Sequence, residues 1–169
     1  MAVPCICLIG WSGSGKTTLL TRLIPELRAL GLRVLALKHS GHAHPLHKPD
    51  SDTERLRDAG AEAVGFATPA GVQLTLPGDP AALVPALLDA LVDRFDLVVV
   101  EGWKDGPFPK VEVFRAGLGE SLAKGRTDAV AVVTDDAPPV PLPHFRTGEV
   151  SALARFLLRL AGPEASSRA

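Results

Sequence analysis

The stretch Gly10–Thr17, GWSGSGKT, constrains the fold more than any other part of this 169-residue chain. It matches the pattern G-x-x-x-x-G-K-[S/T] and lies between an apolar run at 3–9 and a leucine-rich run at 19–30. A short continuous apolar run predicts a buried strand, and leucines at helical spacing predict a helix. Glycines permit a loop whose backbone N–H groups converge on phosphate oxygens. The stretch therefore predicts a strand–loop–helix unit that binds phosphate, with a flexible glycine-rich turn as the alternative.

The residues of this loop have expected roles in binding a nucleoside triphosphate with Mg²⁺. Lys16 is expected to reach the β- and γ-phosphates, and the Thr17 hydroxyl is expected to ligate the metal. The helix that follows presents its positive end to the same phosphates. We predict that the nucleotide contacts come from Gly10, Trp11, Ser12, Gly13, Ser14, Gly15, Lys16, Thr17 and Thr18.

A carboxylate is expected at the end of another buried strand, where it holds the metal or positions the attacking water. The segment DLVVVEG at 96–102 fits, and places Glu101 at the strand's C-terminal end, where Asp is usual. Asp96 starts the same strand and is therefore expected at the opposite edge of the sheet. We predict Glu101 as a metal ligand and, together with Lys16, as a catalytic residue. Lys38 also ends a predicted strand, so we expect it to contact phosphate, with an ordinary salt bridge as the alternative.

Strand and helix patterns alternate along the chain, which predicts an α/β fold. The expected class is the three-layer sandwich of P-loop NTPases, with a mostly parallel sheet and an antiparallel hairpin portion. We expect Pro25 to kink the first helix and the strand at 110–115 to be half-exposed. One nucleotide-binding domain is expected over 1–162, with a flexible tail at 163–169. The predicted strands are 3–9, 33–38, 61–68, 72–76, 96–101, 110–115 and 129–134, and the predicted helices are 16–30, 51–59, 79–92 and 153–160.

Charge, length of apolar runs and cysteine placement narrow the cellular setting. The net charge of −1 supplies no basic field for a nucleic-acid partner. No apolar run is long enough for a membrane span, so no membrane partner is expected. Cys5 and Cys7 point to the same side of one predicted strand, which is poor geometry for a disulfide. We therefore expect free core thiols and a cytoplasmic protein.

Three stretches of the chain together resemble the MobB family of molybdopterin-guanine dinucleotide biosynthesis adaptor proteins. They are GWSGSGKTTLLTRLIPELRALGLRVLALKHS at 10–40, HKPDSDTERLRDAGA at 47–61 and DLVVVEGWKDGPFPKVEVFR at 96–115. The phosphate-loop motif alone is shared by proteins of many functions, whereas the later stretches are much more specific. The resemblance covers roughly residues 3–135.

The resemblance implies a homodimer that binds GTP and Mg²⁺ and hydrolyses GTP weakly. Such a protein would assist a MobA-type guanylyltransferase that attaches GMP to molybdopterin, with molybdopterin itself as a bound substrate. By resemblance Asp52 is a further metal ligand, after the second strand. Asp135 and Asp136 end the last core strand, and we expect one of them to accept hydrogen bonds from a guanine base. Catalysis is expected to be slow, because no glutamine or arginine finger is evident.

Two other functions stay open at this stage. His39, His42, His44 and His47 lie within nine residues, which would suit a nickel or zinc metallochaperone GTPase, although a surface loop or substrate-binding loop is favoured. A P-loop small-molecule kinase would need an arginine-bearing lid, and no segment resembles one.

Two lysines and two tryptophans near these motifs also have open roles. Lys104 and Lys110 flank DGPFP and are expected either to bind an anionic pterin or partner, or to be solvated. Trp11 and Trp103 are expected to stack on a ligand or to cover the sheet edge.

Overall fold

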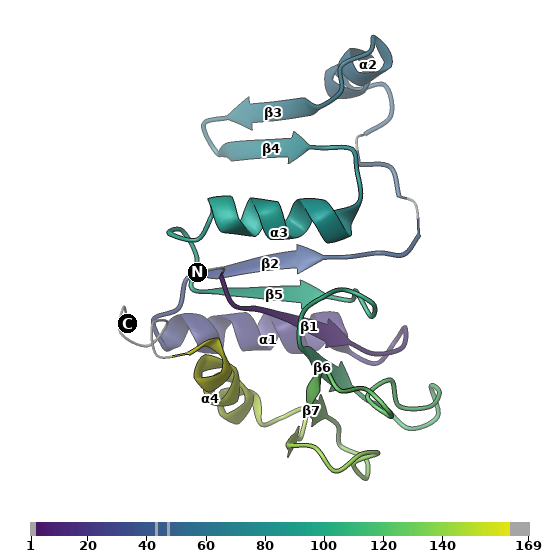
Figure 1. Ribbon diagram of the computed structural model, residues 1–169, viewed down its shortest axis with the longest axis vertical. Coiled ribbons are helices and arrows are strands. Elements are labelled where there is room, and N and C mark those ends of the chain that lie inside the picture. The colour runs from purple at the N-terminus through teal and green to yellow at the C-terminus, as the bar shows by residue number, and fades with distance from the viewer. Residues whose placement is uncertain (1–2, 43, 47, 163–169) are drawn as a thin grey trace. The chain divides into compact units, whose positions relative to one another are not determined.

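The computed structural model describes residues 3–42, 44–46 and 48–162, and divides into two compact units (Figure 1). The first unit comprises residues 1–39 and 85–169, and the second comprises residues 40–84. The expected tail at 163–169 lies outside the described residues. The expectation of one domain over 1–162 stays a prediction.

A six-stranded sheet forms the centre of the first unit, and all its neighbouring strands are parallel. Its order is β2-β5-β1-β6-β7-β8. Because parallel strands end at one edge, the segments after β1, β2 and β5 emerge side by side there. The strands are β1 (Cys5–Ile9), β2 (Val34–Lys38), β5 (Leu97–Glu101), β6 (Lys110–Val113), β7 (Ala129–Val133) and β8 (His144–Phe145).

The burial of the strands follows from their places in the sheet. β1 is buried throughout and β5 nearly so, as their apolar runs predict. The expectation of a half-exposed strand at 110–115 is wrong, because β6 lies between β1 and β7 and all four of its residues are buried. The short strand β8 was not predicted. It follows a proline-rich segment and carries too few residues to show a periodic pattern.

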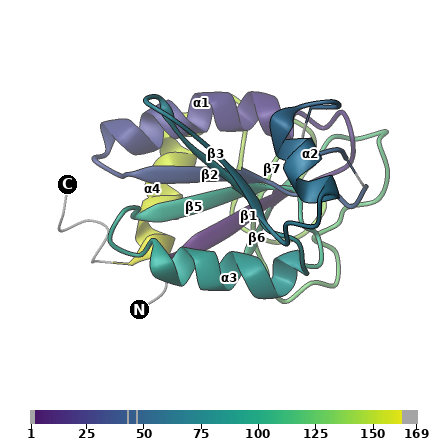
Figure 2. The ribbon, with the colours of Figure 1, turned by 90° about the horizontal axis from the view of Figure 1, so that it is seen from above.

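Helices cover the sheet of the first unit on both sides. α1 (Lys16–Ala29) packs against α4 (Val150–Ala161), and both bury a leucine-containing face in the main core. α1 continues through Pro25, and α4 begins at Val150, three residues before the predicted start. Figure 2 shows α1 on one side of the sheet and α3 (Pro80–Ala90), whose second half belongs to this unit, on the other. The predicted three-layer α/β fold is confirmed.

The second unit contains the predicted hairpin, formed by β3 (Val64–Thr68) and β4 (Gly71–Thr75). The strands are antiparallel and form a separate two-stranded sheet. α2 (Asp52–Asp58) precedes them, and the Ser51 hydroxyl caps it by accepting a hydrogen bond from the Glu54 N–H at 3.3 Å.

Two further expectations concern membranes and thiols. Among the described residues, no helix is both long enough and apolar enough to cross a membrane. Cys5 and Cys7 are buried free thiols, as predicted, and burial raises the pKa of Cys5 to about 12.

Candidate phosphate-binding site

The loop after β1 is shaped by three glycines with positive φ. A Cβ on Gly10 would lie 2.5 Å from the Val113 carbonyl oxygen and 2.6 Å from the Ser14 hydroxyl, so the loop approaches β6 too closely for any other residue. Gly13 and Gly15 have φ of +79° and +96°, and a Cβ there would meet no atom within 4 Å. The side of the loop on which these two glycines lie is therefore open. The buried Ser14 hydroxyl has no hydrogen-bond partner among the described residues. An open, glycine-lined loop of this kind fits a phosphate group.

Lys16 lies at the start of α1 with its ammonium folded over the loop. Its Nζ donates to the carbonyl oxygens of Gly10 at 3.0 Å and Trp11 at 2.8 Å. Burial lowers the pKa of Lys16 below its ordinary value of 10.5, although the Glu101 carboxylate acts in the opposite direction. Gly15 precedes the helix and brings no side-chain acceptor for the N–H groups of the first turn. Those N–H groups and the Lys16 ammonium are suited to an anionic ligand.

The end of β5 brings a carboxylate to the start of α1. The Thr17 hydroxyl lies 2.9 Å from each carboxylate oxygen of Glu101, and the Lys38 ammonium lies 3.7 Å from one of them. A hydroxyl and a carboxylate are hard oxygen ligands of the kind Mg²⁺ prefers, so the pair fits the metal. Three residues predicted from separate parts of the sequence thus meet at one edge of the sheet. Asp96 lies at the other end of β5, as expected, in an ion pair with Arg33 at 2.8 Å.

Two buried charged residues of β6 bind the loop that precedes this strand and the loop that follows it. The Lys110 ammonium is fully buried, donates to the carbonyl oxygens of Gly106 at 2.8 Å and Phe108, and lies 3.6 Å from Asp128. The Glu112 carboxylate, also fully buried, accepts from the Ser121 hydroxyl at 2.5 Å and from the N–H groups at 122 and 123. Lys110 is therefore neither solvated nor available to a ligand, contrary to both expectations. Sequence reasoning missed Glu112, because the groups that donate hydrogen bonds to its buried carboxylate lie in a loop about ten residues away.

Trp103 lies in the loop after β5 and is buried there. It is 8% exposed, stacks on His39 with centroids 5.0 Å apart, and meets Phe108 edge-on at 5.7 Å. It adopts a φ of +62°, which only tight packing sustains in a tryptophan. Trp103 thus covers the sheet edge, which is one of its two expected roles. Trp11 differs, since it is 38% exposed and donates from Nε1 to the Glu120 carbonyl at 2.8 Å.

The carboxylates expected to recognise a base accept hydrogen bonds from other segments of the chain. Asp135 accepts hydrogen bonds from the N–H and hydroxyl of Thr147 at 3.0 and 2.5 Å, and these bonds lower the pKa of Asp135. Asp136 accepts from the Ala116 N–H at 2.7 Å. Both residues follow β7, at the same edge of the sheet as the phosphate loop. Their contact with a base stays a prediction.

The histidine segment is divided between the two units. His39 belongs to the first unit and stacks on Trp103, whereas His44 lies 3.0 Å from the Ser40 hydroxyl in the second. His47 lies outside the described residues. Within residues 3–42, 44–46 and 48–162, no cluster of three or more His, Cys, Asp or Glu side chains could hold a metal ion.

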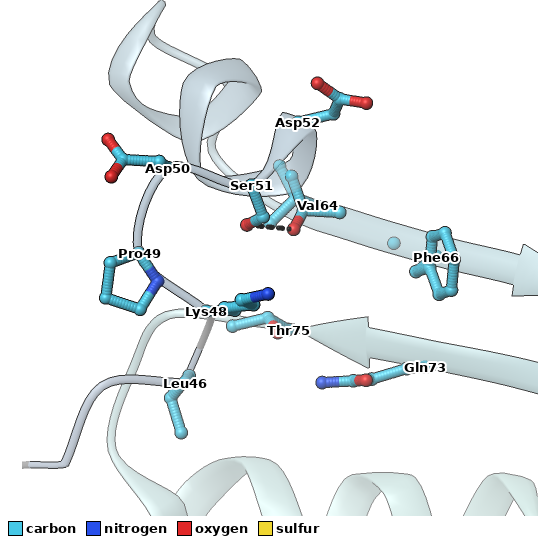
Figure 3. A pocket seen from close by; sticks show the side chains of 12 residues that line it. Leu46, Lys48, Pro49, Asp50, Ser51, Asp52, Val64, Phe66, Gln73 and Thr75 are labelled. Carbon is cyan, nitrogen blue, oxygen red and sulfur yellow. Dashed lines mark hydrogen bonds between the residues drawn. The ribbon is translucent and has the colours of Figure 1, made fainter.

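Asp52 lies in the second unit, where it lines a pocket of about 730 Å³ between the α2 start and the hairpin (Figure 3). The lining includes Lys48, Phe66 and Gln73. Figure 3 shows the carboxylates of Asp50 and Asp52 pointing away from the hairpin strands. The Asp52 side chain is 96% exposed and lies 3.9 Å from Arg55. Its role as a metal ligand stays a prediction, and no pattern in the sequence had indicated the pocket.

The loop after β1 leads directly into α1 and meets the carboxylate at the end of β5, which places the chain in the class of P-loop NTPase folds. Comparison with known proteins then narrows this class. The family model described as MobB, molybdopterin guanine dinucleotide synthesis protein B, matches residues 5–135. The chain belongs to the MobB family.

Relatives and solved structures agree with this assignment. The chain is 36% identical over 140 residues to the molybdopterin-guanine dinucleotide biosynthesis adapter protein of Haemophilus influenzae, covering 79% of this chain and 75% of that one. It is 33% identical over 162 residues to the protein of that name from Escherichia coli, covering 92% of each. The crystal structure of a molybdopterin-guanine biosynthesis protein B matches with a TM-score of 0.69 and 30% identity, over 93% of this chain and 98% of that one. Bacillus subtilis MobB, at 22% identity and a TM-score of 0.69 over 92% and 96% of the chains, shares the fold.

Proposed function

We propose that this protein binds GTP with Mg²⁺ at the loop Gly10–Thr17 and hydrolyses it slowly, as an adaptor in molybdopterin-guanine dinucleotide biosynthesis. The observation that carries the proposal is the contact of the Thr17 hydroxyl with both oxygens of Glu101, at 2.9 Å each, directly beside the open glycine loop. In P-loop proteins a hydroxyl at this position and a strand-end carboxylate are the groups that hold the metal.

Each side chain of the site has a defined part in this proposal. The loop N–H groups and the first turn of α1 would hold the phosphates, and Lys16 would leave its two carbonyl acceptors to reach the β- and γ-oxygens. Thr17 and Glu101 would hold Mg²⁺, with Asp52 as a further proposed ligand. The metal would withdraw charge from the phosphates during hydrolysis. Lys38, whose ammonium lies 3.7 Å from one oxygen of Glu101, would contact phosphate.

Guanine selectivity would depend on the two carboxylates that follow β7. Asp135 and Asp136 lie after β7, on the edge of the sheet that carries the phosphate loop. A carboxylate is the side chain that accepts two hydrogen bonds from the guanine N1–H and amino group. For either residue to do so, its bond to Thr147 or Ala116 would have to be shared or released.

The proposed partners follow from the names of the relatives, which are called adapter proteins of this biosynthesis. We propose a MobA-type molybdopterin guanylyltransferase as the protein partner, molybdopterin as a second ligand, and a homodimer in the cytoplasm. The pocket of the second unit, about 730 Å³, has the size of small-ligand pockets, and Phe66, Gln73 and Lys48 offer an aromatic face, an amide and a cation. It is our candidate for the pterin site.

The proposal is tested by calorimetric titration of the protein with GTP and with ATP, each with Mg²⁺, followed by titration of the MobA-type partner. We expect GTP to bind about tenfold or more tightly than ATP, a difference of about 1.4 kcal/mol, with hydrolysis slower than in most GTPases. The partner is expected to bind the GTP-loaded protein. Preference for ATP together with phosphoryl transfer to a small acceptor would instead indicate a kinase, and absence of partner binding would remove the adaptor role.

A further inference from the structure

The loop after β5 is built to hold Lys104 at one place beside the phosphate loop. Gly102 has a φ of +90°, and a Cβ there would lie 2.6 Å from the His39 carbonyl oxygen. The next residue, Trp103, is wedged between His39 and Phe108. Arg126 donates from Nη2 to the Lys104 carbonyl at 2.7 Å, and the Lys110 ammonium donates to two further carbonyls of the loop. The backbone at Lys104 is therefore fixed on both sides.

The Lys104 side chain extends from this fixed backbone onto Trp11 of the phosphate loop. Its ammonium lies 4.2 Å from the centroid of the Trp11 ring, within the range of a cation–π contact. Trp11 is itself held in place, because its Nε1 donates to the Glu120 carbonyl and a Cβ on Gly119 would lie 2.7 Å from the ring nitrogen. The Trp11 carbonyl accepts from Lys16 at 2.8 Å, so the two ammonium groups approach the same residue of the loop.

The charges around the loop are unbalanced in favour of positive charge. Lys16, Lys38 and Lys104 bring three positive charges, and Lys16 experiences repulsion from both other lysines. Glu101 is the carboxylate that faces them, and Lys38 is the lysine that pairs with it. Within the described part of the chain, Lys104 forms no ion pair, although it is only partly exposed. A net excess of two positive charges matches a magnesium nucleoside triphosphate, in which four negative charges are reduced to two by the metal.

We propose that Lys104 is a binding residue for the terminal phosphate, moving from the Trp11 ring to the γ-phosphate oxygens when a magnesium nucleoside triphosphate binds. The inference rests on the nucleotide site proposed above. The loop containing Lys104 directly follows Glu101, the carboxylate beside Thr17, and so borders the metal and γ-phosphate side of that site. A charge-assisted bond to phosphate is stronger than an exposed cation–π contact, which gives the direction of the movement.

The test compares Lys104→Gln with Lys124→Gln, which removes the same charge at an exposed position outside the site. Calorimetry with GTP and with GDP, each with Mg²⁺, measures how much the terminal phosphate contributes to the binding affinity. We expect Lys104→Gln to weaken GTP binding by about tenfold and GDP binding by less than about threefold. Lys104→Arg is expected to restore most of the wild-type ratio of GTP affinity to GDP affinity. Lys124→Gln is expected to leave both affinities unchanged.

Trp11 provides a second readout that does not depend on the affinity. Binding of GTP should change the tryptophan emission of the wild type as the ammonium leaves the ring, and Trp11→Phe should abolish that change. Equal weakening of GTP and GDP, or none, in a folded Lys104→Gln protein would overturn the role of Lys104 and leave the nucleotide site intact. Failure of the wild type to bind either nucleotide would instead overturn the proposed function itself.

Discussion

Glu101 occupies the position at which P-loop proteins usually carry an aspartate, and its longer side chain reaches the first turn of α1. Both of its oxygens lie 2.9 Å from the Thr17 hydroxyl, and 14% of its side chain is exposed. A carboxylate in this position has two possible contributions, to holding the metal and to orienting the attacking water. A neutral substitution of the same shape separates them.

We predict that Glu101→Gln leaves GTP binding within about threefold of the wild type but slows hydrolysis by about tenfold or more. The amide keeps an oxygen near Thr17 and loses the negative charge, so contacts with phosphate persist while activation of water does not. Calorimetry and single-turnover phosphate release measure the two effects. Unaltered turnover with intact Mg²⁺ dependence would assign the metal carboxylate to another residue, Asp52 first.

Lys110 and Glu112 show where reading single residues from sequence fails. Their alternation with valines in KVEV is typical of a half-exposed strand, in which both charges would face water. Both are fully buried, because β6 has a neighbouring strand on each side. The loop before β6 and the loop after it also fold back and supply hydrogen-bond partners for the two charges. Those partners lie between two and eighteen residues away, and no local pattern reports them.

At the scale of elements, the segment before β7 is tied to the loop after β5 by a cluster of charges. Asp128 accepts two hydrogen bonds from Arg126, at 2.8 and 3.0 Å, and lies 3.6 Å from the buried Lys110. The bonds from Arg126 are the main reason that the pKa of Asp128 lies below its ordinary value of 3.8. A carboxylate with a lowered pKa stabilises the fold above its unfolded-state pKa. That stability is lost as the pH falls through the folded-state pKa.

We predict that Asp128→Asn lowers the melting temperature at pH 7 by about 2–5 °C, because the buried Lys110 ammonium and Arg126 then lose the carboxylate with which they interact. The difference from the wild type should shrink as the pH falls below 3.8, where Asp128 of the wild type also becomes neutral. Calorimetric melting between pH 7 and pH 2 measures it. Asp89→Asn, an exposed control on α3, should match the wild type throughout. A difference independent of pH would show that the charge of Asp128 is not what stabilises the loop.

Elements with a strong periodic pattern were predictable from the sequence, and the remaining ones depended on distant contacts. Continuous apolar runs predicted β1 and β5, and leucines at helical spacing predicted α1. The hairpin was predicted from two short strands around a turn, but not its separation from the main sheet. The strand β8 and the start of α4 at Val150 were missed, since neither carries a local pattern. For the site, Lys16 and Thr17 were predicted from the G-x-x-x-x-G-K-[S/T] pattern, whereas Lys38 and Glu101 were predicted because strand ends in a parallel sheet share an edge. The pairing of Trp11 with Lys104 was not.

At the scale of the whole molecule, the second unit carries apolar side chains exposed on its hairpin. Val72 is 78% exposed and Leu74 is 58% exposed. The two alternate with Gln73, so both lie on the face of the hairpin opposite to Gln73. Exposed apolar side chains on a two-stranded sheet favour association, and a homodimer is the state that we propose.

We predict that the wild type sediments as a dimer of 17.7 kDa chains and that Val72→Glu shifts it toward the monomer, because the new charge would be buried at the interface. Leu160→Glu, at a position of α4 that is 46% exposed, is the matched control and should remain dimeric. Sedimentation equilibrium over a range of concentrations measures both. A monomeric wild type would remove the dimer from the proposal, and a dimeric Val72→Glu would move the interface away from the hairpin.

The most direct test of the nucleotide site is calorimetric titration of Mg²⁺–GTP into the wild type, Lys16→Ala and the exposed control Lys124→Ala. Lys16→Ala removes the ammonium that folds over the loop and leaves the core untouched, so the fold should survive. We expect its affinity for GTP to fall by about a hundredfold or more, while Lys124→Ala binds like the wild type. A folded Lys16→Ala protein that binds GTP as tightly as the wild type would contradict the assignment of Gly10–Thr17 as the phosphate-binding loop.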